Sequence, residues 1–258
     1  MLLFRRILLT VTITLATILA IVQWIAPIAL SFYASRKAPP VARVIPSELR
    51  DQSVSQNIGK KLSYLDYQFD LPWNDLDEAQ TRLYPKDKPK SRVDLRFRSG
   101  LRLLVTSSRS QEFLKGLAEE MRVSPQTIES TFGSSDYQVT KTIFEFTPDR
   151  MDHWSLSPRV HAREEFLLLI KSIVPTSSAD SGIFNIENKY SKGFQEGDPR
   201  VRPNGILVHL FYDQGSIEFI FFQKDYARKE GITQGEINRV IQSVYPEQHT
   251  VAAGQLVQ

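Results

Sequence analysis

The side chains best suited to bind a metal ion lie between residues 149 and 165. His153 and His161 are accompanied there by four carboxylates, Asp149, Asp152, Glu164 and Glu165. His161 and Glu165 are four residues apart, so on a helix they would be neighbours that could both ligate zinc. Their spacing matches no established zinc signature such as H-E-x-x-H. We therefore predict no metal and no cofactor, and keep a metal-dependent hydrolase centred on His153, His161 and Glu165 as an alternative.

The basic side chains are unevenly distributed along the chain. From Arg82 to Arg109 there are nine basic and two acidic residues, a net charge of +7, which leaves −4 for the rest of a chain whose total is +3. Such a segment would attract polyanions, and its binding would weaken with added salt. The alternative is that these charges form the solvated side of an edge hairpin, where they prevent stray strand pairing. The predicted anion-binding residues are Lys86, Lys88, Lys90, Arg96, Arg98 and Arg102.

Nucleophilic catalysis has little support in the sequence. No G-x-S-x-G motif is present, and Ser134, Ser135 and Ser216 lie in turn or helix-cap contexts. The chain has no cysteine, which excludes disulfides, thiolate metal sites and cysteine nucleophiles. We predict no catalytic residue, and whether the chain is an enzyme stays open, with binding favoured.

Alternating apolar residues predict the strands that must position these groups. The pattern marks a strand over 62–71, a hairpin over 93–105 with its turn at Ser99-Gly100, and a second hairpin over 205–223. A further strand is expected over 182–190, and a turn over 193–199.

Helical spacing and cap residues predict the remaining elements. Helices are expected over 111–122, from Ser124-Pro125 to Phe132, over 135–146, from Ser157-Pro158 to Val174, and from Thr233 to Val244, with a short helix near 75–84. The order of elements predicts an α+β domain with a mainly antiparallel sheet of about five or six strands and covering helices.

The amino-terminal segment from Ile7 to Ser35 has no charged residue in twenty-nine positions. A helix that crosses a hydrocarbon core of about 30 Å needs roughly 20 apolar residues, so this segment is predicted to be a transmembrane signal anchor. Trp24, Phe32 and Tyr33 would lie near a membrane interface. A cleaved signal peptide and a buried core helix are the alternatives.

The anchor divides the rest of the chain. We expect a short head over 1–6 in the cytoplasm, an extended linker over 36–61, a single domain over 62–246 outside the cytoplasm, and a loose tail over 247–258. A split near Pro148 to Ser157 is the alternative domain boundary. Arg5 and Arg6 on one side nearly balance Arg36, Lys37 and Arg43 on the other, so charge alone does not fix the orientation.

These patterns together favour a single-pass protein of the cytoplasmic membrane that binds rather than catalyses, as an accessory subunit of an envelope assembly. Its expected partners are the lipid bilayer through residues 7–35 and a membrane or envelope protein. An anionic lipid or polymer bound by the basic hairpin is the alternative partner, and nucleic acid is not expected.

Overall fold

A computed structural model of the chain describes residues 12–19, 21–57, 59–84, 91–155, 157–172, 182–201, 204–223 and 231–247. The chain forms two compact units. One comprises Met1–Ile45 and Thr140–Ala179, and we call it the helical unit. The other comprises Pro46–Val139 and Asp180–Gln258, and we call it the sheet unit.

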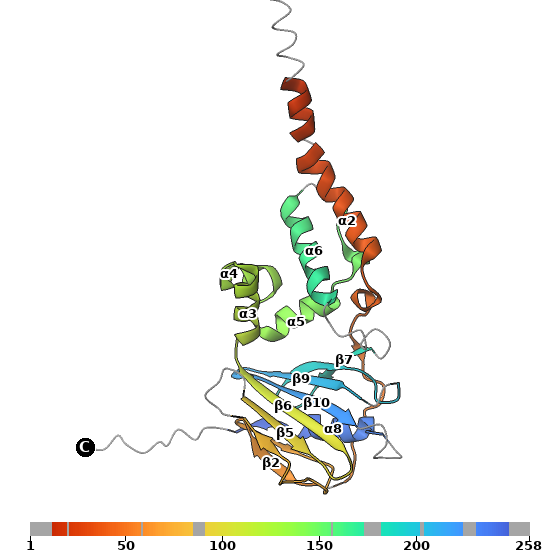
Figure 1. The fold of residues 1–258 in the computed structure, drawn as a ribbon, viewed down its shortest axis with the longest axis vertical. Helices are drawn as coiled ribbons and strands as arrows, with labels where there is room; N and C mark the ends of the chain where they lie inside the picture. The colour runs from red at the N-terminus through yellow and green to blue at the C-terminus, as the bar shows by residue number, and fades with distance from the viewer. Residues whose placement is uncertain are drawn as a thin grey trace, which may run out of the picture. The chain divides into compact units, whose positions relative to one another are not determined.

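The sheet unit is built on an eight-stranded sheet with the order β1-β7-β8-β9-β10-β6-β5-β4 (Figure 1). All of its neighbouring strands are antiparallel except β1 and β7. The α+β class is therefore confirmed, whereas the predicted size of five or six strands was too small. The strands are β1 (Ser47–Glu48), β4 (Arg82–Leu83), β5 (Ser91–Arg96), β6 (Leu101–Arg109), β7 (Ile183–Glu187), β8 (Lys192–Glu196), β9 (Ile206–Tyr212) and β10 (Gly215–Gln223).

A second, three-stranded sheet has the order β11-β3-β2, formed by Tyr245–Pro246, Tyr67–Asp70 and Lys61–Tyr64. The single strand predicted over 62–71 is in fact the hairpin β2–β3. Its turn residues, Leu65 and Asp66, both have positive φ, at 60° and 67°. Turns of this kind usually carry Asn or Gly, so these two residue types did not mark one. Leu65 accepts the conformation while its side chain is buried in the core.

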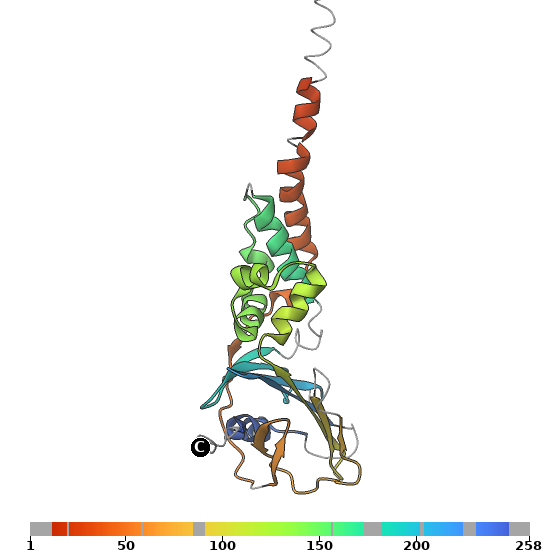
Figure 2. The ribbon, with the colours of Figure 1, turned by 90° about the vertical axis from the view of Figure 1, so that its left-hand side faces the viewer.

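The core of the sheet unit lies between one face of the large sheet and a layer made of the small sheet and α8 (Gln234–Ser243) (Figure 2). The inward side chains alternate along the strands, as in Ile217, Phe219 and Phe221 of β10. Phe69 of β3 meets Phe219 edge to face, with ring centroids 5.2 Å apart. The predicted capping box of α8 is present, because Thr233 and Glu236 each bond the other's backbone N–H.

Three further helices connect β6 to the second half of the chain. They are α3 (Glu112–Met121), α4 (Pro125–Phe132) and α5 (Asp136–Glu145). Ser124 caps α4 as predicted, accepting the N–H of Thr127. The short helix predicted near 75–84 is wrong, because the Asp77 carboxylate accepts backbone N–H groups in a local turn and β4 follows.

The helical unit contains the π-helical turn η1 (Ile21–Ile25), α2 (Ala26–Lys37), the 3-10 turns η2 (Pro40–Arg43) and η3 (Pro148–Arg150), and α6 (Pro158–Ser172). Residues 12–19 are also helical. Ala42, Met151 and Leu168 form its small apolar core. The structure describes no helix that is both long and apolar enough to cross a membrane, and residues 7–11 and 20 of the predicted span lie outside the described ranges.

Candidate functional site

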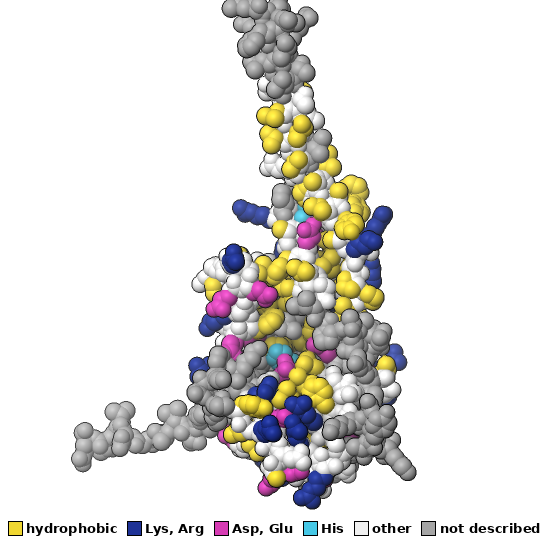
Figure 3. Space-filling model, viewed as in Figure 1, with side chains coloured by type: hydrophobic (Ala, Val, Ile, Leu, Met, Phe, Trp, Pro, Cys, Tyr) yellow, Lys and Arg dark blue, Asp and Glu magenta, His cyan; other side chains and the backbone are white. Residues whose placement is uncertain are grey.

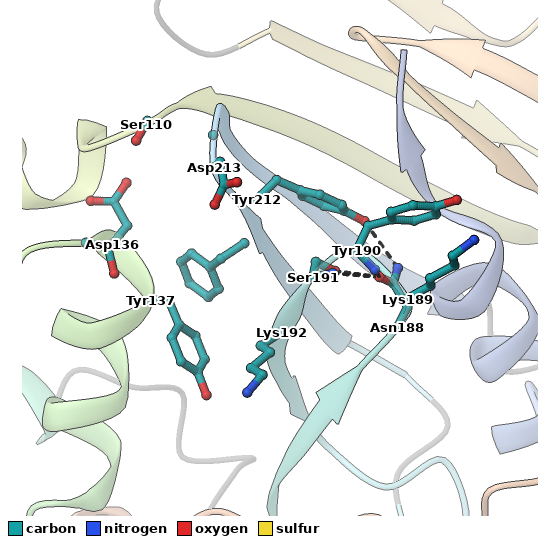
Figure 4. Close-up of a pocket in the computed structure, with 13 residues that line it drawn as sticks. Ser110, Asp136, Tyr137, Asn188, Lys189, Tyr190, Ser191, Lys192, Tyr212 and Asp213 are labelled. Atoms are coloured by element: carbon teal, nitrogen blue, oxygen red, sulfur yellow. Dashed lines mark hydrogen bonds between the residues drawn. The ribbon is translucent and has the colours of Figure 1, made fainter. Parts of the chain in front are cut away.

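An open pocket of about 480 Å³ lies in the sheet unit, where four connections between elements meet (Figure 4). It is lined by the end of β6, the start of α5, the turn between β7 and β8, and the turn between β9 and β10. The residues are far apart in the chain, so only the folded sheet brings them together. They include Ser110, Asp136, Tyr137, Asn188, Lys189, Tyr190, Ser191, Lys192, Phe211, Tyr212 and Asp213.

Aromatic rings form one wall of this pocket. The Tyr137 ring stacks on Phe194, with centroids 5.5 Å apart and an interplanar angle of 16°, and meets Phe211 edge to face at 5.7 Å. Phe211 in turn stacks on His209 at 4.1 Å. Because Phe194 and Phe211 are buried, Tyr137 is held against a fixed surface and offers its half-buried ring to the pocket.

Asn188 fixes the shape of the opposite wall. Its side-chain oxygen accepts the backbone N–H groups of Tyr190 and Ser191, both at 2.9 Å. Its amide nitrogen donates to the carbonyls of Ile241 at 2.8 Å and Val244 at 3.1 Å. The β7–β8 turn is thus fastened to the end of α8, and the Tyr190 side chain is left 55% exposed at the pocket rim.

Two ionisable groups in the pocket have structural roles. Asp136 accepts the backbone N–H of Leu114 at 3.0 Å at the start of α3, and burial raises the pKa of Asp136 despite its hydrogen bonds to backbone groups of residues 111–114. The Tyr212 hydroxyl donates to the Val244 carbonyl at 3.3 Å, and burial raises its pKa. Lys189, Lys192 and Asp213 are exposed, so these charges are the ones that a ligand would meet.

The predicted basic site is partly assembled on the β5–β6 hairpin. Arg96 and Arg102 are direct cross-strand partners, an arrangement in which like charges repel. Asp94 offsets this repulsion, since its buried carboxylate accepts from Arg102 Nε at 2.7 Å and from Arg96 at 3.4 Å. Burial raises the pKa of Asp94, but the two guanidinium groups outweigh burial and the net shift is downward.

The other predicted basic residues are placed differently. Arg98 is exposed in the turn after β5, and Lys86, Lys88 and Lys90 lie outside the described residues. Arg92 packs over the Tyr84 ring at 4.1 Å, and Arg102 lies 5.6 Å from the Phe222 ring centre. Figure 3 shows Lys and Arg side chains gathered beside hydrophobic ones over the front of the sheet unit.

The histidines of the alternative metal site serve the local fold. His161 Nε2 donates to the Ser155 carbonyl at 2.7 Å, and His153 Nδ1 forms a 2.7 Å hydrogen bond with Ser31 Oγ. Glu165 is partly exposed on α6, and both oxygens of Glu164 accept the backbone N–H of Asp152. Within the described ranges, no three His, Cys, Asp or Glu side chains are grouped so that they could hold a metal ion.

Sequence reasoning did not find the pocket. Its rim turn, Asn188 to Ser191, fell at the end of the strand predicted over 182–190, and the following strand β8 was expected to be a turn. The polar run Asn-Lys-Tyr-Ser was an available turn signal. No protein-family model, curated protein or solved structure matches the chain.

Proposed function

We propose that this chain is a single-pass protein of the cytoplasmic membrane, anchored by residues 7–35, whose sheet unit lies outside the cytoplasm and binds an envelope protein. The uncharged twenty-nine-residue segment supports the anchor. The open pocket of the sheet unit, with its wall of stacked aromatic rings, is the observation that carries the binding role.

The pocket has the features of a recognition site. A fixed aromatic wall supplies apolar contact area, and a few polar groups around it can select the ligand. The exposed Tyr190 ring provides contact at little entropic cost, because its backbone is already held by Asn188. Lys189 and Lys192 flank Tyr190 and favour a ligand with carboxylates. The proposed occupant is therefore an acidic, partly apolar segment of a partner protein.

Crosslinking from the pocket tests this role. A photo-reactive phenylalanine analogue in place of Tyr190, in the full chain in its own membrane, should give one discrete crosslinked partner, identified by mass spectrometry. Lys192→Glu should weaken the crosslink several-fold, since it places a negative charge against an acidic ligand. The control Lys115→Glu reverses an exposed charge on α3, outside the pocket lining, and should leave the crosslink unchanged.

Loss of the crosslink in both charge variants, or in neither, would contradict a role for the pocket. A crosslink that maps to a cytoplasmic protein would contradict the proposed compartment.

A second candidate function is the binding of an anionic lipid or polymer by the basic hairpin. The observation in its favour is that the guanidinium groups of Arg96 and Arg102 both contact the Asp94 carboxylate and are themselves partly exposed. With the full chain in zwitterionic nanodiscs, fluorescent polyphosphate should bind with a strong salt dependence. Arg96→Gln combined with Arg98→Gln should weaken that binding several-fold, and unchanged binding would eliminate this candidate.

A further inference from the structure

We propose that the turn over residues 152–155, the Trp154 turn, is a second membrane contact, with Trp154 inserted among the lipid headgroups beside the anchor. This inference rests on the anchor of the proposed function. It adds a lipid-binding residue that lies more than a hundred positions from that anchor in the sequence.

Trp154 is unusually exposed for a tryptophan. Its side chain is 76% accessible, the largest value among the large hydrophobic side chains that the structure describes. Trp73, by comparison, is buried and donates to Glu236 at 2.8 Å. Exposing an indole to water costs hydrophobic free energy, and its ring and N–H suit an interface that is apolar on one side and wet on the other.

The Trp154 turn is attached directly to α2. His153 is hydrogen-bonded to Ser31, whose side chain is fully buried, and the His153 ring stacks on Phe32 with centroids 4.3 Å apart. The Trp154 ring meets the same Phe32 ring edge to face, at 5.4 Å. The position of Trp154 along the membrane normal is therefore set by Phe32.

The opposite side of the turn is held by α6. Glu164 accepts the backbone N–H of Asp152 at 3.1 Å, and His161 donates to the Ser155 carbonyl. Both side chains are buried, which is rare for a glutamate without a partner. Two helices thus fix the ends of a turn whose central side chain faces away from the protein.

The length of the anchor places this side chain at the interface. A helix of twenty-nine residues would span about 44 Å at a rise of about 1.5 Å per residue, which matches the roughly 40–45 Å of a bilayer with its headgroups. Phe32 is in the last turn of that segment, so it and Trp154 would lie in the headgroup layer. Tyr33 beside them is 63% exposed, and Arg36 and Lys37 follow, where they can meet lipid phosphates.

Tryptophan fluorescence of the full chain in phosphatidylcholine nanodiscs tests the proposal. The chain has three tryptophans, so the difference between Trp24→Phe and the double variant Trp24→Phe/Trp154→Phe isolates Trp154, with buried Trp73 common to both. We expect Trp154 to be quenched by lipids that carry a nitroxide near the headgroup and to be several-fold less accessible to aqueous acrylamide than a free indole.

The remaining variants separate the two claims. In Trp154→Phe, Trp24 reports on the anchor, and lipid quenching of Trp24 without lipid quenching of Trp154 would overturn this inference alone. If neither tryptophan is quenched by lipid, the anchor itself is wrong. His153→Ala should reduce the lipid quenching of Trp154, because the turn loses its attachment to Ser31 and Phe32. A Trp154 that is fully accessible to acrylamide in the nanodisc would contradict the proposal.

Discussion

We expect the stability of the helical unit to depend on pH, because Lys171 is buried there. Its side chain is fully buried, and its ammonium group donates to the carbonyls of Phe144 at 2.7 Å and Phe146 at 2.6 Å, near the end of α5. Burial, assisted by the positive charge of Arg150, lowers the pKa of Lys171 from 10.5 to about 8. The two hydrogen-bond acceptors of the Lys171 ammonium are neutral carbonyls, so they offset the cost of burying its charge less than a carboxylate would.

The sign and size of the effect follow from proton linkage. Between pH 8 and pH 10.5 the unfolded chain keeps the Lys171 proton while the folded chain releases it, so stability rises with pH. The difference between the pKa of Lys171 in the unfolded and in the folded chain corresponds to roughly 3 kcal/mol of unfolding free energy, of which about 2 kcal/mol should appear between pH 8 and pH 10.

The assay is denaturant unfolding of the full chain in non-ionic micelles, followed by the fluorescence of Trp154, taken as the difference between Trp24→Phe and Trp24→Phe/Trp154→Phe. Lys171→Met should remove the rise between pH 8 and pH 10, since no titratable group remains at this position. Lys171→Arg should also remove it, because a guanidinium group stays charged over this range. A flat wild-type profile, or a rise that persists in Lys171→Met, would refute the reasoning.

Three substitutions in the sheet unit test its packing by denaturant unfolding of the full chain. Asn188→Ala removes both sets of hydrogen bonds that fasten the pocket rim and should lower the free energy of unfolding by about 2–3 kcal/mol. The control Asn185→Ala loses one exposed hydrogen bond and should change it by less than about 0.5 kcal/mol. Equal losses in the two variants would contradict the role of Asn188 in holding the β7–β8 turn. In Gly193→Ala the new Cβ would overlap the backbone carbonyl oxygen of His209, so the free energy of unfolding should fall by more than about 3 kcal/mol. The control Gly116→Ala, at an open position in a helix, should raise it by up to about 1 kcal/mol. A tolerated Gly193→Ala would refute the close approach of strand β9 to Gly193. Trp73→Phe keeps an aromatic ring, but it removes part of a buried indole and the donor to the Glu236 carboxylate, so a loss of about 1–3 kcal/mol is expected; an unchanged midpoint would contradict a stabilising role for that hydrogen bond.

Local patterns predicted the parts of this fold that depend on local chemistry. The hairpins β5–β6 and β9–β10 follow from apolar alternation around a turn, and the caps at Ser124 and Thr233 follow from residue type. Strand β8 was missed because Gly193 interrupts its pattern. That glycine is required by the approach of the neighbouring strand β9, which no local pattern shows.

The candidate sites depend on contacts that are distant in sequence. The pocket joins residues 110, 136, 190 and 213, and the Trp154 turn is attached to Ser31 across 122 positions. The basic residues could be counted from the sequence. The sequence did not show that the Asp94 carboxylate binds the guanidinium groups of Arg96 and Arg102. Composition identified possible chemistry, whereas the long-range strand order decided which side chains meet.

The most direct test of the proposed membrane topology is to measure on which side of the cytoplasmic membrane the sheet unit lies. A reporter enzyme that is active only outside the cytoplasm, fused after Gln258 of the full chain, should be active and should remain in the membrane fraction after alkaline extraction. The same fusion starting at Arg36, without the anchor segment, should be inactive and soluble. An inactive full-length fusion, or an active one that alkaline extraction releases, would contradict a body held outside the cytoplasm by an uncleaved anchor.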